Sequence, residues 1–158
     1  MSALALVLSN LKVELPNGGS VSLVMAPIFV LAFTRGAKAA ALSGVIVGVV
    51  KAMLSPHIYH PIQFLLDYPV AYGSAALGAL FPKKVDLGVI VGMFARFAAH
   101  FTSGIVFFAS FAPRGMSVWR YSLVYNAAYI VPETVITVII IRILAARGVI
   151  ARAEDGVN

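Results

Sequence analysis

The sequence predicts an all-α, polytopic membrane protein, a bundle of six transmembrane helices that forms a single domain over residues 1–158. Hydrophobic residues make up 61% of the chain and charged residues only 11%, whereas soluble globular chains carry about 25% charged residues. The mean hydropathy is +0.95. The chain has no cysteine, which excludes disulfides, zinc–thiolate sites, iron–sulfur clusters and thiol catalysis.

Three of the six hydrophobic segments lie in the first part of the chain. The first, at about residues 2–13, is short, because a helix of about 12 residues covers only about 18 Å of a hydrocarbon core about 30 Å thick. Turn-forming residues at 15–19 precede a second segment at about 20–34, in which Pro27 predicts a kink. A basic turn at 35–38 then leads to a third segment at about 39–55.

The other three segments are longer. They cover about residues 61–81, 87–112 and 118–146, and Pro82-Lys83-Lys84 separates the first two of these. Each reaches the length of roughly 20 residues that a helix needs to cross a bilayer. Residues 147–158 form a polar tail.

The basic residues predict an orientation in the membrane. With the N-terminus inside, the inner side carries Arg35, Lys38, Lys83, Lys84, Arg142, Arg147 and Arg152. The outer side carries Lys12, Arg114 and Arg120. Because cytoplasmic loops are enriched in Lys and Arg, seven against three favours cytoplasmic N- and C-termini, and hence a cytoplasmic tail at 147–158. The net charge of +6 is spread over short loops and helix interiors, so no basic run indicates nucleic acid as a partner.

The pentapeptide Gly-Val-Ile-Val-Gly occurs twice, at residues 44–48 and 88–92. Such GxxxG arrangements let membrane helices approach closely, and we interpret both as sites of helix packing. The phosphate-binding pattern Gly-x-x-x-x-Gly-Lys-Ser/Thr does not occur in the sequence, so hydrolysis of a nucleotide by that route is not expected.

Several polar residues stand inside the hydrophobic segments. The ionisable ones are Lys51, Asp67, Arg96, His100 and Glu133, and the others are Tyr68, Tyr121, Tyr125 and Asn126. Ionisable groups within a membrane are costly and are functional candidates by default. Counting from the loops places the carboxylate, the imidazole, the amide and several aromatic rings at one depth, in the outer half of three helices. This convergence predicts a binding pocket that opens to the outside.

Structural roles remain open for some of these residues. Asp67 could neutralise Lys51 or Arg96, and Arg96 and Glu133 are expected to be structural partners. His57 and His60 would be the only candidates for a metal site, and we predict no metal. Without a nucleophile next to a base at readable spacing, the sequence does not indicate an enzyme.

Tyr121 and Asn126 pose a question of geometry. They are five residues apart and diverge by about 140° on an ideal helix. Both can border one pocket only if it is broad or lies in a corner between helices.

Four motifs connect the chain to a known family. They cover residues 16–23 (PNGGSVSL), 60–69 (HPIQFLLDYP), 96–104 (RFAAHFTSG) and 121–126 (YSLVYN). In these motifs, and over nearly its whole length, the chain resembles the thiamine-specific substrate-binding (S) component of energy-coupling factor (ECF) transporters. The resemblance implies a six-helix S-component fold in a prokaryotic cell membrane and capture of thiamine from outside. It also implies partners, namely a transmembrane coupling protein and two ATP-binding subunits.

The resemblance also implies roles for individual residues. Asp67 would contact the aminopyrimidine beside Tyr68, His100 and Phe108 would flank the thiazolium ring, Tyr121 and Asn126 would contact the pyrimidine, and the backbone of Gly104 would lie close to the ligand. In the family the position of Phe108 is often tryptophan. The contact with the coupling protein would involve Ala5 and Ser9 of the first segment, and no cofactor is implied beside the ligand thiamine.

Two other functions remain as alternatives. The chain could be an S component for another small vitamin. It could also be a stand-alone carrier in which Asp67, Arg96 and Glu133 form a proton relay, since buried charges mark such relays.

Overall fold

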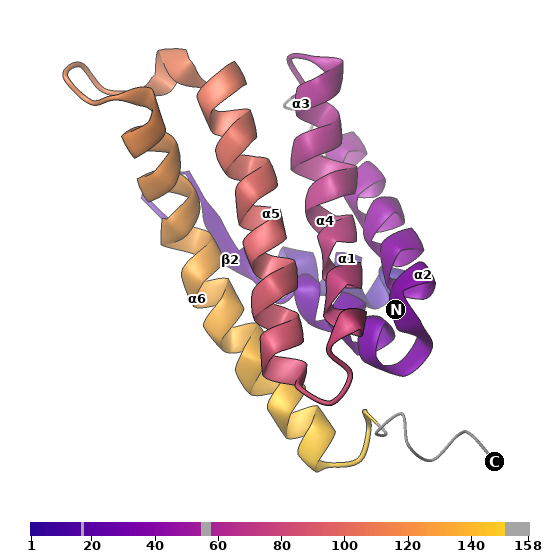
Figure 1. Cartoon of the computed structure of the whole chain (residues 1–158). Coiled ribbons are helices and arrows are strands. Elements are labelled where there is room, and N and C mark those ends of the chain that lie inside the picture. Colours follow the sequence, from indigo (N-terminus) through magenta and orange to yellow (C-terminus); the bar gives the residue numbers. More distant parts are fainter. Residues whose placement is uncertain (17, 55–57, 151–158) are drawn as a thin grey trace.

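A computed structural model describes residues 1–16, 18–54 and 58–150 of the chain. In this part the protein is mostly helical, and three helices are long and apolar enough to cross a membrane. These are α2 (Met25–Leu54), α5 (Val85–Phe107) and α6 (Val118–Ala146). Figure 1 shows α5 and α6 side by side, with the other helices on the opposite side of α5. Of the predicted polar tail, residues 151–158 lie outside the described part.

The N-terminal region differs from the all-helical prediction. Helix α1 (Ser2–Asn10) ends three residues earlier than expected, and strands β1 (Lys12–Glu14) and β2 (Ser20–Ser22) follow it as an antiparallel hairpin. The predicted turn between them is confirmed in its described residues: the Leu15 N–H donates to the Gly19 carbonyl at 2.7 Å, and Gly18 has φ +90°. Asn17 lies outside the described residues.

The exposed hairpin carries its own ion pair. Lys12 Nζ and Glu14 Oε1 lie 2.9 Å apart, because residues two apart on a strand point to the same face. The hydrogen bond and the charge of Lys12 hold the pKa of the Glu14 carboxyl below its usual value.

The bend in α2 lies at Gly36, and the kink predicted at Pro27 is wrong. Pro27 lies in the first turn of the helix, which begins at Met25, where a missing N–H leaves no helical hydrogen bond unmade. Gly36 has φ +81° and ψ −179°, a backbone conformation that glycine adopts without steric cost. Gly36 therefore divides α2 into two helices at the predicted basic turn. They correspond to the hydrophobic segments predicted at 20–34 and 39–55, although the first helix begins only at Met25.

Residues 61–80 form a continuous but irregular helical segment, which corresponds to the predicted fourth segment at 61–81. It consists of α3 (Pro61–Leu65), the π-helical turn η1 (Leu66–Val70), α4 (Ala71–Gly73) and the 3₁₀ helix η2 (Ser74–Leu80). Pro69 has no N–H to donate, and a π-helical turn is one way in which a helix accommodates such a residue. Turns of this kind often occur at functional sites, and this one contains Asp67 and Tyr68.

The last two segments largely follow the prediction. Helix α6 has the predicted bounds, whereas α5 begins at Val85 and ends at Phe107, and a short 3₁₀ helix, η3 (Ala109–Phe111), completes the predicted fifth segment.

Both glycine pentapeptides are sites of close helix packing, as predicted. A Cβ atom on Gly48 would lie 2.6 Å from the carbonyl carbon of Tyr68, so α2 and the 61–80 segment touch backbone to backbone. A Cβ atom on Gly92 would lie 2.8 Å from the ring of Phe29. The Gly48 contact places the π-helical turn against α2, and the Gly92 contact places α5 against the same element.

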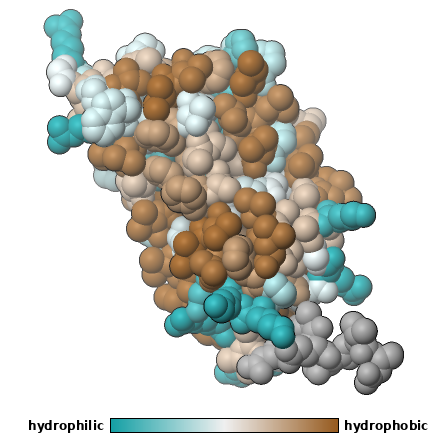
Figure 2. All heavy atoms as spheres, in the orientation of Figure 1, coloured by the Kyte–Doolittle hydropathy of each residue, from teal (hydrophilic) through white to brown (hydrophobic). Residues whose placement is uncertain are grey.

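The outer surface suits a bilayer. Large hydrophobic side chains are exposed on every long helix, for example Met53 (76% exposed) on α2, Phe94 (69%) on α5 and Val131 (58%) on α6. Figure 2 shows hydrophobic residues over most of one face, with hydrophilic residues mainly at its ends and edges. Since soluble proteins rarely expose so extensive an apolar surface, this surface is that of a membrane protein.

Candidate ligand-binding site

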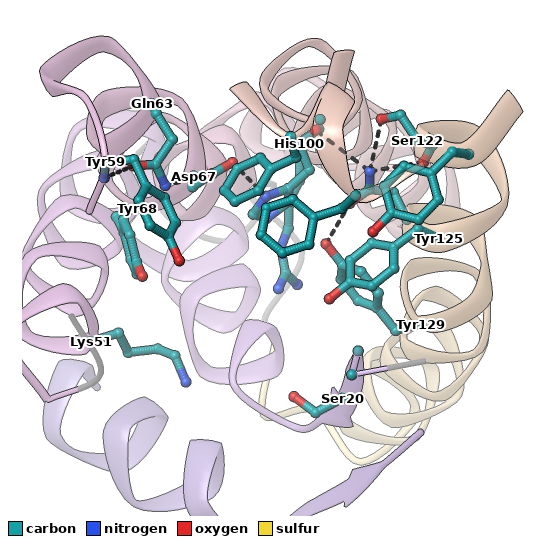
Figure 3. Close-up of a pocket in the computed structure, with 18 of the residues that line it drawn as sticks. Ser20, Lys51, Tyr59, Gln63, Asp67, Tyr68, His100, Ser122, Tyr125 and Tyr129 are labelled. Carbon is teal, nitrogen blue, oxygen red and sulfur yellow. Dashed lines mark hydrogen bonds and ion pairs between the residues drawn. The ribbon is translucent and has the colours of Figure 1, made fainter. Parts of the chain in front are cut away.

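A cavity of about 540 Å³ lies between the hairpin, α2, the 61–80 segment, α5 and α6 (Figure 3). Its volume falls within the range of roughly 300–1,000 Å³ found for small-molecule sites. All seven residues proposed as ligand contacts line it: Asp67, Tyr68, His100, Gly104, Phe108, Tyr121 and Asn126. The structure thus brings together residues from three separate segments of the chain, as the counting of depths predicted.

Asp67 is the centre of a hydrogen-bond network on one wall. Its Oδ1 lies 3.1 Å from Nδ1 of His100. Its Oδ2 accepts hydrogen bonds from Gln63 Nε2 at 2.6 Å and from Ser103 Oγ at 2.9 Å. The hypothesis that Asp67 pairs with a lysine or an arginine is therefore wrong, because the carboxylate faces the imidazole instead.

The imidazole of His100 keeps one nitrogen available. Its Nδ1 faces Asp67, whereas its Nε2 is buried without a hydrogen-bond partner in the described part of the chain. A buried polar atom without a partner is costly, and this one belongs to a residue that lines the cavity. A ligand bearing a hydrogen-bonding group could satisfy it.

Asn126 is held by hydrogen bonds within α6, and one of its partners, Ser122, links α6 to α5. Its Nδ2 donates to the Ser122 carbonyl at 2.9 Å, and its Oδ1 accepts from the Tyr129 hydroxyl at 2.8 Å. Ser122 Oγ in turn donates to the Phe101 carbonyl at 2.8 Å. A Cβ atom on Gly104 would clash with Ser122, so glycine there permits the close approach of the two helices.

Aromatic rings line much of the cavity. Tyr121, Tyr125 and Tyr129 follow one another at intervals of four along α6, with ring centroids 5.8 and 6.0 Å apart. Phe108 contacts Tyr59 edge to face, with centroids 5.7 Å apart. The cavity is wide enough, at about 540 Å³, for both Tyr121 and Asn126 to border it although they diverge on α6.

A buried ion pair lies deeper in the same region. Arg96 Nη1 and Glu133 Oε2 are 2.9 Å apart, and their side chains are only 5% and 0% exposed. Ser22 Oγ of the hairpin donates to Glu133 Oε1 at 3.3 Å, and the Arg96 guanidinium lies 5.0 Å from the centre of the Tyr72 ring. The expectation that Arg96 and Glu133 are structural partners is confirmed.

Sequence reasoning missed several cavity residues. They include Tyr59, Gln63, Ser122 and Tyr129, and the contact of Ser103 with Asp67 was missed as well. Helical spacing could have suggested two of them, because Gln63 precedes Asp67 by four residues and Ser103 follows His100 by three.

Two further predictions concern the small residues of α1 and the histidines before α3. Ala5 and Ser9 are 0% and 6% exposed and lie within the contact between α1 and the rest of this chain. Their small size serves packing inside the chain, and their contact with a coupling protein stays a prediction. For the histidines, His57 lies outside the described residues, while His60 caps α3 by accepting from the Ile62 N–H and stacks on Phe107.

Comparison with known proteins identifies the family. Residues 1–150 match the model of a family described as thiamine transporter protein (Thia_YuaJ). The chain belongs to this thiamine transporter family. A curated relative, the thiamine transporter ThiT of Bacillus subtilis (strain 168), is 39% identical over 91% of this chain and 85% of its own length. A second ThiT, from Lacticaseibacillus paracasei, is 33% identical over 75% of this chain and 69% of its own length.

A solved structure supports the same conclusion for the fold. ThiT from Listeria monocytogenes superimposes with a TM-score of 0.84 at 27% sequence identity, covering 92% of this chain and 89% of the other. The resemblance read from the four motifs is thus confirmed at the level of the family.

Proposed function

We propose that this protein is the thiamine-binding S component of an ECF-type importer, with the six-helix S-component architecture. It takes thiamine from outside the cell into the cavity beside Asp67 and His100 and delivers it through an ATP-driven partner module. The observation that carries the proposal is the cavity, in which a carboxylate, an imidazole and several aromatic rings face one space in a member of the thiamine transporter family.

The chemistry of the cavity suits this ligand. Thiamine carries a fixed positive charge on a flat thiazolium ring, and an aromatic face attracts such a cation by about 0.5–2 kcal/mol. The Asp67 carboxylate supplies the opposite charge. The remaining polar groups of the cavity can satisfy the donors and acceptors of the pyrimidine, which would otherwise be buried unpaired at about 1–3 kcal/mol each.

The partners belong to the same proposal. An S component associates with a transmembrane coupling protein and two ATP-binding subunits, and we place both termini of this chain in the cytoplasm on the charge pattern of its loops. Uptake of thiamine into proteoliposomes should then require the partner subunits and ATP. Uptake by this chain alone, driven by a pH gradient, would contradict the partner assignment and favour a proton-coupled carrier.

The decisive test of the ligand is a titration of the detergent-purified protein with thiamine. Trp119 and the tyrosines of the cavity supply intrinsic fluorescence, and calorimetry on the same sample measures binding independently of the position of these fluorophores. We expect saturable binding at nanomolar to low-micromolar thiamine, with no competition from riboflavin, biotin or pyridoxine. A flat calorimetric titration would refute thiamine as the ligand.

A further inference from the structure

Lys51 is a cation in a cavity that we assign to a cationic ligand. It lies near the end of α2 and lines the cavity. Figure 3 shows its side chain extending from α2 into the cavity, on the side away from Asp67 and His100 and on the same side as Ser20 of the hairpin. A charge in this position affects which ligands bind and how they are oriented.

The other charged groups around the cavity are paired. Arg96 forms its ion pair with Glu133, and Asp67 faces His100. Among the ion pairs of the described residues, none includes Lys51. A buried or half-buried ammonium group without a carboxylate is costly unless a ligand or water compensates it.

Position on the helix does not explain this lysine. A lysine in the last turn of a membrane helix usually extends along the surface toward the lipid headgroups. Here the neighbouring Met53 and Leu54 are the exposed residues of that turn, at 76% and 69%, whereas Lys51 faces the interior of the protein. Its ammonium group can therefore contact a ligand in the cavity.

We propose that Lys51 forms an anion subsite, which binds the phosphate of a thiamine phosphate ester and sets the orientation of the ligand. This inference rests on the proposed function. Repulsion keeps the thiazolium ring away from Lys51 and at the wall of Asp67 and His100, and the hydroxyethyl arm then extends toward Lys51 and Ser20. Esterification turns the end of that arm into an anion, which an ammonium group binds by charge-assisted hydrogen bonds.

The test compares affinities for thiamine and thiamine monophosphate in purified wild-type protein and in Lys51→Gln. Lys38→Gln is the matched control, because Lys38 is an exposed lysine of the same helix and does not line the cavity. We expect Lys51→Gln to weaken binding of the monophosphate by about ten- to a hundredfold, the usual effect of one charge-assisted hydrogen bond. Thiamine itself should bind as well as before or slightly more tightly, and Lys38→Gln should change neither affinity.

Two outcomes separate this inference from the proposed function. If wild-type protein binds thiamine but Lys51→Gln weakens thiamine and its monophosphate equally, the anion subsite is refuted while the ligand assignment stands. If wild-type protein binds neither compound, both proposals fail. Lys51→Arg keeps the charge and should retain most of the affinity for the monophosphate, which distinguishes loss of charge from loss of fold.

Discussion

Asp67 shows how a single side chain in this cavity is prepared for a ligand. Gln63, His100 and Ser103 all contact its carboxylate, and they come from two different helical segments. These contacts fix the rotamer of the carboxylate before any ligand arrives. A carboxylate held in this way loses little conformational entropy on binding.

The carboxylate of Asp67 should therefore be essential for binding thiamine. Asp67→Asn keeps the size of the side chain but removes the charge, and we expect the affinity for thiamine to fall by about ten- to a hundredfold, since a hydrogen bond to a charged group contributes about 1.5–3 kcal/mol. Calorimetry measures the change. Asp86→Asn is the control, because Asp86 pairs with Arg142 outside the cavity. Equal affinities for the wild type and Asp67→Asn would contradict the site.

Residue spacing anticipated part of this site. The depth of Asp67, His100 and Asn126 within their segments could be counted from the loops, and motif resemblance supplied Phe108 and Gly104. The partners of Asp67 could not be derived in the same way. Which side chain of one helix meets Ser103 of another depends on rotation and crossing angle, and neither is encoded in the spacing within a single segment.

Contacts between helical elements place the π-helical turn that carries Asp67 and Tyr68. Gly48 of α2 leaves room for the backbone of Tyr68, and Gly44 does the same for Tyr72 one turn away. The 61–80 segment is thus supported by backbone contacts with α2 on the side away from the cavity. Because protein interiors are closely packed, a larger side chain in this contact with α2 should displace the cavity residues of the 61–80 segment.

Gly48→Ala should test this support. Its new Cβ would lie 2.6 Å from the backbone of Tyr68, so the segment must shift, and we expect a loss of about 1–3 kcal/mol in the free energy of unfolding together with weaker thiamine binding. Denaturant unfolding in detergent and calorimetry measure the two effects. Gly73→Ala is the matched control, because its Cβ would meet Val45 at 3.7 Å, an ordinary contact. Equal stability of the two variants would refute the argument.

Element boundaries were predictable where the sequence signal was long. Helix α6 has 29 residues, and the hydrophobic segment between the loop before Val118 and the polar tail after Ala146 was long enough to predict its bounds. The hairpin was missed because its strands have three residues each, too few for a period of two to stand out from a hydrophobic helix. Pro27 was misread because the effect of a proline depends on whether it lies in the first turn of a helix or in its interior, and the hydrophobic pattern alone does not show where the helix begins.

At the scale of the whole molecule, the Arg96–Glu133 pair joins parts of the chain that are distant in sequence. Arg96 lies on α5, Glu133 on α6, and Ser22 of the hairpin donates to the same carboxylate. The pair thereby ties the hairpin, which lines one side of the cavity, to helices α5 and α6. By contrast, Arg142 and Asp86 join the same two helices through side chains that are 67% and 35% exposed.

These two ion pairs should differ strongly in their effect on stability. Glu133→Gln leaves the buried Arg96 without a counter-charge, and we expect a loss of about 3–5 kcal/mol in the free energy of unfolding. Asp86→Asn breaks only an exposed pair and should cost about 0–1 kcal/mol. The double variant Arg96→Met/Glu133→Met removes both buried charges and should recover most of the lost stability, since apolar replacement of a complete buried pair is often neutral. Denaturant unfolding in detergent measures all three. A double variant as unstable as Glu133→Gln would mean that the contacts with Ser22 and Tyr72, rather than the balance of charge, hold the hairpin to α5 and α6.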